Sequence, residues 1–204
     1  MRRPLVFVFA LMLLATVAWA DRYSDCNQFA DPDRRIRGCT QVIERGKRES
    51  REIRSFAYTN RGNAYDDKGE VDRAIADYTK ATALDPNYAM AYTNRGLTYE
   101  KKGEVDRAIA DYTKAIALDP NYAIAYTNRG AAYYSKGEVD RAIADFDETI
   151  KRNPNYAITY TNRGYAYEKK GDKDQAIADF RKALEINPST QDAKDSLKRL
   201  GVTP

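Results

Sequence analysis

Tyr58-Thr59-Asn60-Arg61-Gly62 is the stretch that decides the fold, because the chain repeats it three more times. The same five residues return at 92–96, 126–130 and 160–164, so each copy starts 34 residues after the one before. A fixed period of this size is typical of stacked supersecondary units and not of a single wound core. The sequence therefore predicts four units in register, at 55–88, 89–122, 123–156 and 157–190.

Within a unit, the apolar and small residues predict two antiparallel helices. In the first unit, Tyr58, Gly62 and Tyr65 share one helix face, and Lys68-Gly69 breaks that helix. A second helix follows and ends before Pro86, because proline disfavours helix in the residue that precedes it. Its packed face carries Ala74, Ile75, Tyr78, Ala81 and Thr82.

This pattern closely resembles the tetratricopeptide repeat family, whose signature places aromatic, Gly, Ala and Pro residues at fixed offsets. The matching residues are Tyr58, Gly62, Tyr65, Ala74, Tyr78, Ala81 and Pro86 in the first unit; Tyr92, Gly96, Tyr99, Ala108, Tyr112, Ala115 and Pro120 in the second; Tyr126, Gly130, Tyr133, Ala142, Phe146 and Pro154 in the third; and Tyr160, Gly164, Tyr167, Ala176, Phe180, Ala183 and Pro188 in the fourth. Thr149 replaces one alanine in the third unit, and tyrosine stands where the family usually has tryptophan. The resemblance implies an all-α, right-handed solenoid of four helix-turn-helix repeats with helical caps at both ends.

One departure from the family recurs in every unit. Arginine stands where leucine is common, and an aspartate follows each arginine sixteen residues later. The pairs are Arg61 and Asp77, Arg95 and Asp111, Arg129 and Asp145, and Arg163 and Asp179. An ion pair between the two helices is one interpretation. The other is a local partner four residues away, such as Arg73 for Asp77, which in the last unit is only Gln175.

Residues 1–20 read as a secretory signal peptide. Arg2 and Arg3 precede an apolar run, and Ala18-Trp19-Ala20 has small residues where a signal peptidase cleaves. The alternative is an uncleaved membrane anchor, but the run is short for a bilayer span of about 20 residues. We therefore expect an exported protein, periplasmic or secreted, that meets the membrane only transiently through this peptide.

Both ends of the repeat array are expected to be capped. Residues 21–54 predict an N-terminal helical cap that contains Cys26 and Cys39, the chain's two cysteines. In an oxidising compartment such a pair favours a disulfide, with two buried free thiols as the alternative. Residues 191–204 predict a C-terminal capping helix with Ala193, Leu197 and Leu200 on one face.

Composition narrows the classes of function. The chain has no histidine, which removes the commonest general base and the commonest metal ligand, and it has no Gly-rich phosphate loop. Its net charge of +4 is nearly balanced, without the run of basic residues that tracks nucleic acid. We predict no catalysis, cofactor, metal, nucleic acid or small-molecule substrate.

The resemblance implies that the first helix of each unit lines a groove that receives an extended peptide or a partner helix of another protein. The predicted groove residues are Phe56, Asn60, Asn63, Met90, Asn94, Leu97, Ile124, Asn128, Tyr134, Ile158, Asn162 and Tyr165. The same face carries Thr59, Thr93, Thr127 and Thr161, and differs most between units at positions such as Asp66, Glu100, Tyr134 and Glu168. The lysines that the family uses to clamp a C-terminal carboxylate are absent.

The asparagine of the repeated stretch recurs once per unit, as Asn60, Asn94, Asn128 and Asn162. An amide both donates and accepts, so such a ladder can hold a peptide backbone whatever its side chains. The alternatives are that these asparagines contact only water, and that the variable positions are exposed sites under drift. At the level of the whole protein, the alternative to an adaptor is a structural subunit of a cell-envelope assembly.

Overall fold

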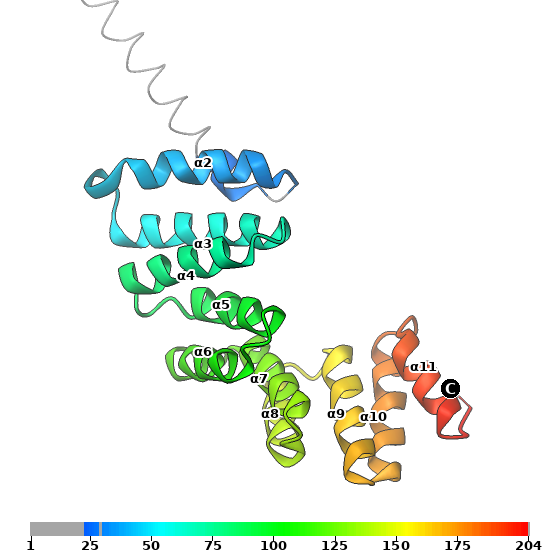
Figure 1. Cartoon of the computed structure of the whole chain (residues 1–204). Helices are drawn as coiled ribbons and strands as arrows, with labels where there is room; N and C mark the ends of the chain where they lie inside the picture. Colours follow the sequence, from blue (N-terminus) through cyan, green and yellow to red (C-terminus); the bar gives the residue numbers. More distant parts are fainter. Residues whose placement is uncertain (1–22, 29, 204) are drawn as a thin grey trace, which may run out of the picture. The chain divides into compact units, whose positions relative to one another are not determined.

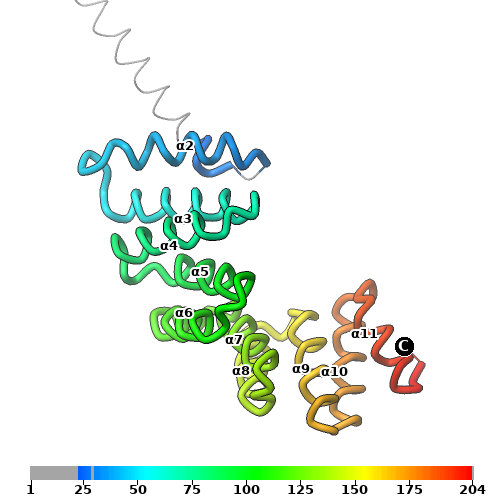
Figure 2. The backbone as a smooth tube through the Cα atoms, viewed as in Figure 1, coloured from blue at the N-terminus to red at the C-terminus, as the bar shows by residue number. Residues whose placement is uncertain are grey.

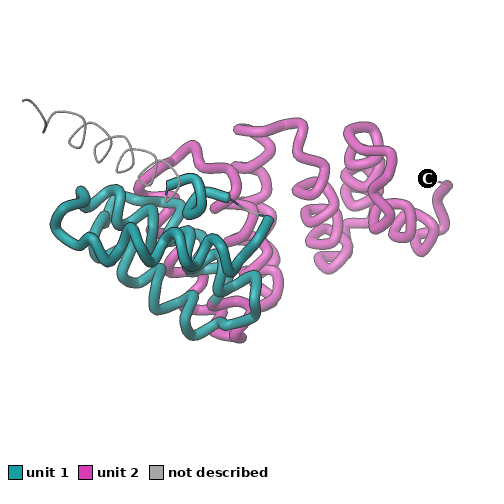
Figure 3. Tube along the Cα trace, turned by 90° about the horizontal axis from the view of Figure 1, so that it is seen from above, with its two compact units in different colours: residues 1–98 teal, residues 99–204 magenta. Residues whose placement is uncertain are grey.

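The computed structural model describes residues 23–28 and 30–203, and every regular element in those ranges is helical. The predicted signal peptide lies outside the described residues. The chain divides into two compact units, residues 1–98 and 99–204 (Figure 3). None of the described helices combines the length and the apolar character that crossing a bilayer requires.

Unit 1 contains the N-terminal cap and the first helix pair (Figure 1). Its elements are α2 (Pro32–Glu44), the 3₁₀ helix η1 (Gly46–Arg48), α3 (Arg51–Asp67), α4 (Val71–Leu84) and most of α5 (Ala89–Lys101). Asp31 starts α2 by accepting hydrogen bonds from the backbone N–H groups of Asp33 and Arg34, and Pro32 follows at the first helical position. Gly69 follows α3 with φ +73°, a left-handed conformation that turns the chain back toward α4.

Unit 2 begins at the last turn of α5 and contains the remaining helices. These are α6 (Val105–Leu118), α7 (Ala123–Ser135), α8 (Val139–Arg152), α9 (Ala157–Lys170), α10 (Lys173–Ile186) and α11 (Gln191–Arg199). Figure 2 follows the backbone as it doubles back between α7 and α8, and again between α9 and α10. From α6 to α11, each helix packs against the next one in sequence. The predicted all-helical architecture of antiparallel pairs is confirmed.

The glycine of the repeated stretch is needed for close helix packing. A Cβ atom on Gly62 would lie 2.7 Å from the ring of Tyr78, and one on Gly164 would lie 2.7 Å from the ring of Phe180. Both rings are fully buried. The glycine therefore makes room for an aromatic ring of the second helix.

Three of the recurrent arginines, Arg61, Arg129 and Arg163, pair with aspartates across the two helices of a repeat. Arg61 donates from Nε to Asp77 Oδ2 at 2.7 Å and from Nη2 to Oδ1 at 2.9 Å. Arg129 and Asp145, and Arg163 and Asp179, form the same two-bond pair. The local alternative is not used in the first unit, because Arg73 bonds to Glu70 and to the hydroxyl of Tyr65.

Burial works against the charge of Arg61, but the hydrogen bond that Arg61 donates to Asp77 and the charge of that carboxylate outweigh it, so the pKa of Arg61 is raised. The side chains of Arg61 and Asp77 are 17% and 9% exposed. A two-bond pair with this little exposure fixes one helix against the other more firmly than a surface ion pair would.

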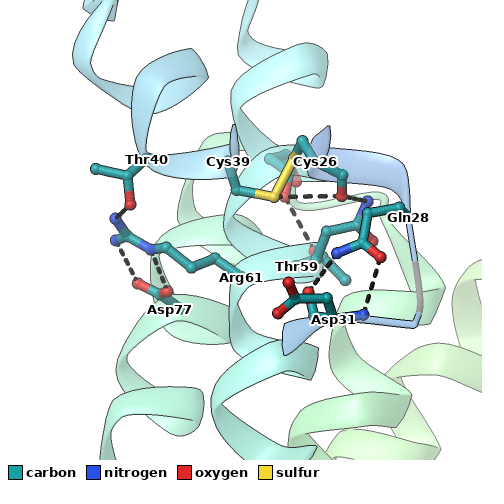
Figure 4. The surroundings of a disulfide bond; sticks show 10 residues. Cys26, Gln28, Asp31, Cys39, Thr40, Thr59, Arg61 and Asp77 are labelled. Carbon is teal, nitrogen blue, oxygen red and sulfur yellow. Dashed lines mark hydrogen bonds and ion pairs between the residues drawn. A yellow bond between two sulfur atoms is a disulfide. The ribbon is translucent and has the colours of Figure 1, made fainter. Parts of the chain in front are cut away.

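The two caps are built differently. In unit 1, Cys26 and Cys39 form a disulfide that packs with Val42 and Ala57 (Figure 4). In unit 2, α11 packs against α10 through Leu197, which is fully buried in a cluster with Phe180.

Candidate functional site

The first helix of three successive repeats carries an exposed apolar side chain at the same position, so that these residues are 34 apart in sequence. All three were among the predicted groove residues. Met90 on α5, Ile124 on α7 and Ile158 on α9 are 46%, 46% and 50% exposed. They account, with Leu97, for the exposed large hydrophobic residues of the described chain. Large apolar side chains left in water at a repeated position are candidates for contact with a ligand.

Asn60, the first predicted member of the ladder, is not available to a ligand. It is 6% exposed, and its Nδ2 donates to the backbone carbonyl of Cys26 at 3.1 Å. The prediction is corrected for this position, because the N-terminal cap covers the face of α3 from which Asn60 projects.

Asn94 is also held within the protein. Its Nδ2 donates to Oδ1 of Asn63 at 2.8 Å, and the same oxygen accepts a bond from the hydroxyl of Tyr78 at 2.7 Å. An open pocket of about 450 Å³ lies here in unit 1. Its lining is polar and charged except for Leu97 and the ring of Tyr78; the remaining residues are Arg35, Asn63, Asp66, Asp67 and Asn94.

Asn128 and Asn162 differ from the first two asparagines. Both are partly exposed, and within the described residues neither side chain forms a hydrogen bond to the protein. The difference depends on the residue that stands 31 positions earlier, in the preceding repeat. Asn94 reaches Asn63, which precedes it by 31 residues, whereas the residue 31 before Asn162, within unit 2, is Ala131. Alanine offers no side-chain acceptor, so the amide of Asn162 keeps its capacity to bind.

A second open pocket, of about 420 Å³, surrounds the last of these amides in unit 2. Ile158 and Asn162 of α9 form one side, and the start of α11 forms the other. The lining residues are Ala157, Ile158, Thr161, Asn162, Asn187, Thr190, Gln191 and Asp192. The pocket therefore combines an exposed apolar side chain with an unbonded amide four residues away.

The threonines of the repeated stretch do not lie on the groove surface, contrary to the prediction. Thr59, Thr93, Thr127 and Thr161 are all buried. Thr59 and Thr93 donate to the carbonyls of Ser55 and Ala89, four residues earlier on the same helix. A threonine hydroxyl satisfied in this way can pack between helices, which is what occurs here.

The aromatic groove residues are partly engaged by neighbours. The ring of Tyr165 packs edge-on against Phe180, with ring centroids 5.4 Å apart. Lys169 Nζ lies 4.7 Å from the centroid of the Tyr134 ring. Phe56 is half-buried. In unit 2 the exposed apolar contacts are therefore supplied chiefly by Ile124 and Ile158.

Two acidic residues occupy equivalent positions near the ends of first helices in unit 2. Glu100 at the end of α5 accepts a hydrogen bond from the buried hydroxyl of Tyr112, and burial raises the pKa of the Glu100 carboxyl above its ordinary value. Glu168 at the end of α9 accepts from Arg199 of α11, at 3.2 Å from Nε and 2.7 Å from Nη2.

Sequence reasoning missed the residues that the caps contribute. Arg35 lies outside the repeats, so the 34-residue period carried no signal for it. Gln191 and Asp192, by contrast, stand 34 residues after Ala157 and Ile158. Extending the register into the C-terminal cap would have placed α11 beside the last pocket.

Comparison with known proteins agrees with this architecture. Family profiles described as TPR repeat match residues 62–103 and 101–137, and profiles described as tetratricopeptide repeat match 123–156 and 157–190. Among proteins with curated annotation, no match is found.

The chain is similar to 387 chains of solved structures, among them the following three. A crystal structure of MamA is 34% identical, with a TM-score of 0.69, over 77% of this chain and 89% of that one. A second MamA structure is 30% identical, with a TM-score of 0.70, over 93% of this chain and 97% of that one. The first TPR domain of Spaghetti (RPAP3), bound to the HSP90 peptide SRMEEVD, is 29% identical, with a TM-score of 0.55, over 55% of this chain and 90% of that one.

Proposed function

Because the chain belongs to the tetratricopeptide repeat family, a non-catalytic scaffold family for protein–protein interaction, we propose that it is an adaptor that binds an extended segment of another protein along α7 and α9. Asn128 and Asn162 hold the backbone of that segment. Ile124 and Ile158 contact its apolar side chains.

The observation that carries the proposal is the repeated pairing of an exposed isoleucine with an unbonded amide. Ile124 precedes Asn128, and Ile158 precedes Asn162, by four residues, so each pair lies on one helix face. An extended peptide presents backbone donors and acceptors and alternating side chains, which suit an amide beside an apolar contact.

The similar RPAP3 domain, whose structure contains the peptide SRMEEVD, supports a peptide as the class of ligand. That peptide carries three acidic residues. This chain has threonine and apolar residues early in its groove helices, where the family's carboxylate clamp needs lysines. The proposed ligand is therefore an internal extended segment and not an acidic C-terminus.

The proposed place of action is outside the cytoplasm. Residues 1–20 have the composition of a signal peptide, and the disulfide between Cys26 and Cys39 suits an oxidising compartment. Trp19 is the chain's one tryptophan and lies in the segment to be removed. Protein recovered from the extracytoplasmic fraction should show tyrosine emission alone; tryptophan emission there would mean that the segment is retained.

The test is a paired capture of partners from the native extracytoplasmic extract. The baits are the wild-type protein, Asn128→Ala/Asn162→Ala, and the matched control Asn121→Ala/Asn155→Ala. The control removes two amides from the same repeats, but from the exposed turns that precede α7 and α9. We expect the groove variant to bind its captured partner more weakly by about 1–3 kcal/mol, the worth of two to three backbone hydrogen bonds.

Equal retention of the same partners by all three baits would reject α7 and α9 as the binding surface. Loss with the control alone would move the site to the turns. A partner that stays in fixed stoichiometric complex with the protein through purification would favour the structural subunit of an envelope assembly over an exchanging adaptor.

A further inference from the structure

Glu100 is a groove-face carboxylate without a counter-ion. It stands at the position that Asp66, Tyr134 and Glu168 occupy in the other units. The buried hydroxyl of Tyr112, on α6, donates to its Oε2 and fixes the side chain. Within the described residues no lysine or arginine forms an ion pair with it. Holding a half-buried carboxylate in place without a cation costs desolvation that one neutral hydrogen bond does not fully offset.

The chain itself shows what this position binds when a cation is at hand. Glu168, 68 residues after Glu100 and therefore two periods on, receives the guanidinium of Arg199 on both of its carboxylate oxygens. Arg199 comes from α11, the helix that follows the last repeat. A guanidinium fork on a carboxylate is the geometry that favours arginine in recognition.

The register also shows why no residue of the chain fills the same role at Glu100. Arg199 follows Glu168 by 31 residues, and the residue that follows Glu100 by 31 is Ala131 on α7. Alanine has no side-chain donor, so this position supplies no cation to Glu100. The same 31-residue step joins Asn63 to Asn94 in unit 1.

From this geometry we infer that Glu100 binds a basic side chain, arginine or lysine, of the partner's extended segment. The inference rests on the proposed function and names its ligand more closely: a segment with apolar residues for Ile124 and Ile158 and a basic residue for Glu100. The charge is opposite to that of the acidic peptide bound by the similar RPAP3 domain.

The test separates the charge of Glu100 from its packing. Glu100→Gln keeps an acceptor for Tyr112 and nearly the same volume, but removes the negative charge. Glu185→Gln, at an exposed glutamate of α10, is the matched control. Random twelve-residue peptides displayed on phage are selected on wild type, on both glutamine variants and on Asn128→Ala/Asn162→Ala.

Wild type and Glu185→Gln should enrich peptides that combine apolar residues with arginine or lysine. Glu100→Gln should still enrich apolar peptides but lose the preference for a basic residue. A winning peptide is then synthesised with its basic residue and with citrulline, the neutral analogue of arginine. Citrulline should weaken binding to wild type about ten-fold, as expected for one partly desolvated charge-assisted pair, and leave binding to Glu100→Gln unchanged.

The outcomes separate the two proposals. If wild type selects peptides that need Asn128 and Asn162 but shows no preference for basic residues, the role of Glu100 is refuted and the adaptor proposal stands. The same holds if Glu100→Gln keeps the preference. If wild type selects no peptide at all, both fall.

Discussion

The asparagine of the repeated stretch is bonded within the protein in unit 1 and open in unit 2. In unit 1, Asn60 is covered by the N-terminal cap and bonded to Cys26, and Asn94 is bonded to Asn63. In unit 2, Asn128 and Asn162 are partly exposed and form no hydrogen bond within the described chain. The repeated stretch is identical in all four cases, so its own residues do not decide which copies can bind a ligand.

The residue that decides whether the amide is open lies in the preceding repeat. Asn63 holds the amide of Asn94, whereas alanine at the equivalent position, Ala131, offers no acceptor and leaves the amide of Asn162 open. In a repeat protein each repeat contacts mainly its neighbours. Whether the asparagine of one repeat is free to bind therefore depends on a residue of the preceding repeat. Under the proposed function, unit 1 contributes mainly to stability and unit 2 carries the binding surface.

The largest effect we expect is on the free energy of unfolding, and it differs between the arginine–aspartate pairs of the two units. Arg61 has one carboxylate partner, Asp77, and a neutral one, the hydroxyl of Thr40, whereas Arg163 contacts both Asp179 and Asp147. Asp77→Ala leaves a largely buried guanidinium without any anion and should destabilise the protein by about 3–4 kcal/mol. Asp179→Ala leaves Asp147 in place and should cost about 1–2 kcal/mol.

Urea unfolding followed by circular dichroism, with hydrogen exchange to locate the loss, measures both variants. Asp77→Asn is the control, because it keeps the size of the side chain and one of the two acceptors without the charge, and it should fall between wild type and Asp77→Ala. Equal losses in the two alanine variants would mean that the second carboxylate at Arg163 contributes nothing.

The second effect concerns the caps. The disulfide between Cys26 and Cys39 ties the N-terminal segment to α2, and closing a loop of this length contributes roughly 2–3 kcal/mol. Cys26→Ser/Cys39→Ser should therefore lower the protection of α2 and α3 in hydrogen exchange while α10 and α11 keep theirs. Two reactive thiols in the denatured, unreduced wild-type protein would contradict the bridge.

The third effect tests the two fates of the asparagine directly. Asn60→Ala leaves the buried carbonyl of Cys26 without its donor and should lower stability by about 1–2 kcal/mol without changing ligand affinity. Asn162→Ala should leave stability within about 0.5 kcal/mol and weaken binding instead. Thermal unfolding and titration with a selected peptide measure the two quantities. The same response from both variants would remove the distinction between the units.

The sequence was sufficient for the helices, because period, glycine and proline positions all constrain the local chain in the same way. It left the pairing of Arg61 with Asp77 open, since Arg73 was an equally close candidate along the helix. In the structure Arg73 bonds to Glu70 and Tyr65, so Asp77 pairs with Arg61 of the neighbouring helix. Periodicity alone does not contain this competition.

The candidate site was predicted less well, for two physical reasons. Asn60 is covered by a segment outside the repeats, whose path over α3 is set by a disulfide and not by the 34-residue period. Thr59 and its equivalents looked polar enough for a surface, but their hydroxyls bond to carbonyls one turn back and become compatible with burial. The exposed row of Met90, Ile124 and Ile158 was predictable, because an apolar residue that recurs off the packed face has no partner in the repeat.

The smallest effect we expect comes from giving unit 2 the acceptor that holds the asparagine amide in unit 1. Ala131 precedes Asn162 by the same 31 residues that separate Asn63 from Asn94. Ala131→Asn should supply the missing acceptor and hold the amide of Asn162, weakening the binding of a selected peptide by about 0.5–1.5 kcal/mol, the worth of one hydrogen bond. Because the added amide is partly exposed, stability should change by less than about 0.5 kcal/mol.

A double-mutant cycle shows whether the loss arises through Asn162. If Ala131→Asn acts by holding that amide, it should weaken binding in wild type but add little to the loss already caused by Asn162→Ala. Since Ala131 also stands 31 residues after Glu100, the cycle is repeated with Glu100→Gln, to show whether part of the loss arises through that carboxylate. Wild-type affinity in Ala131→Asn would show that the preceding unit does not control the open amides. Full additivity with Asn162→Ala would show that the new side chain only obstructs the groove.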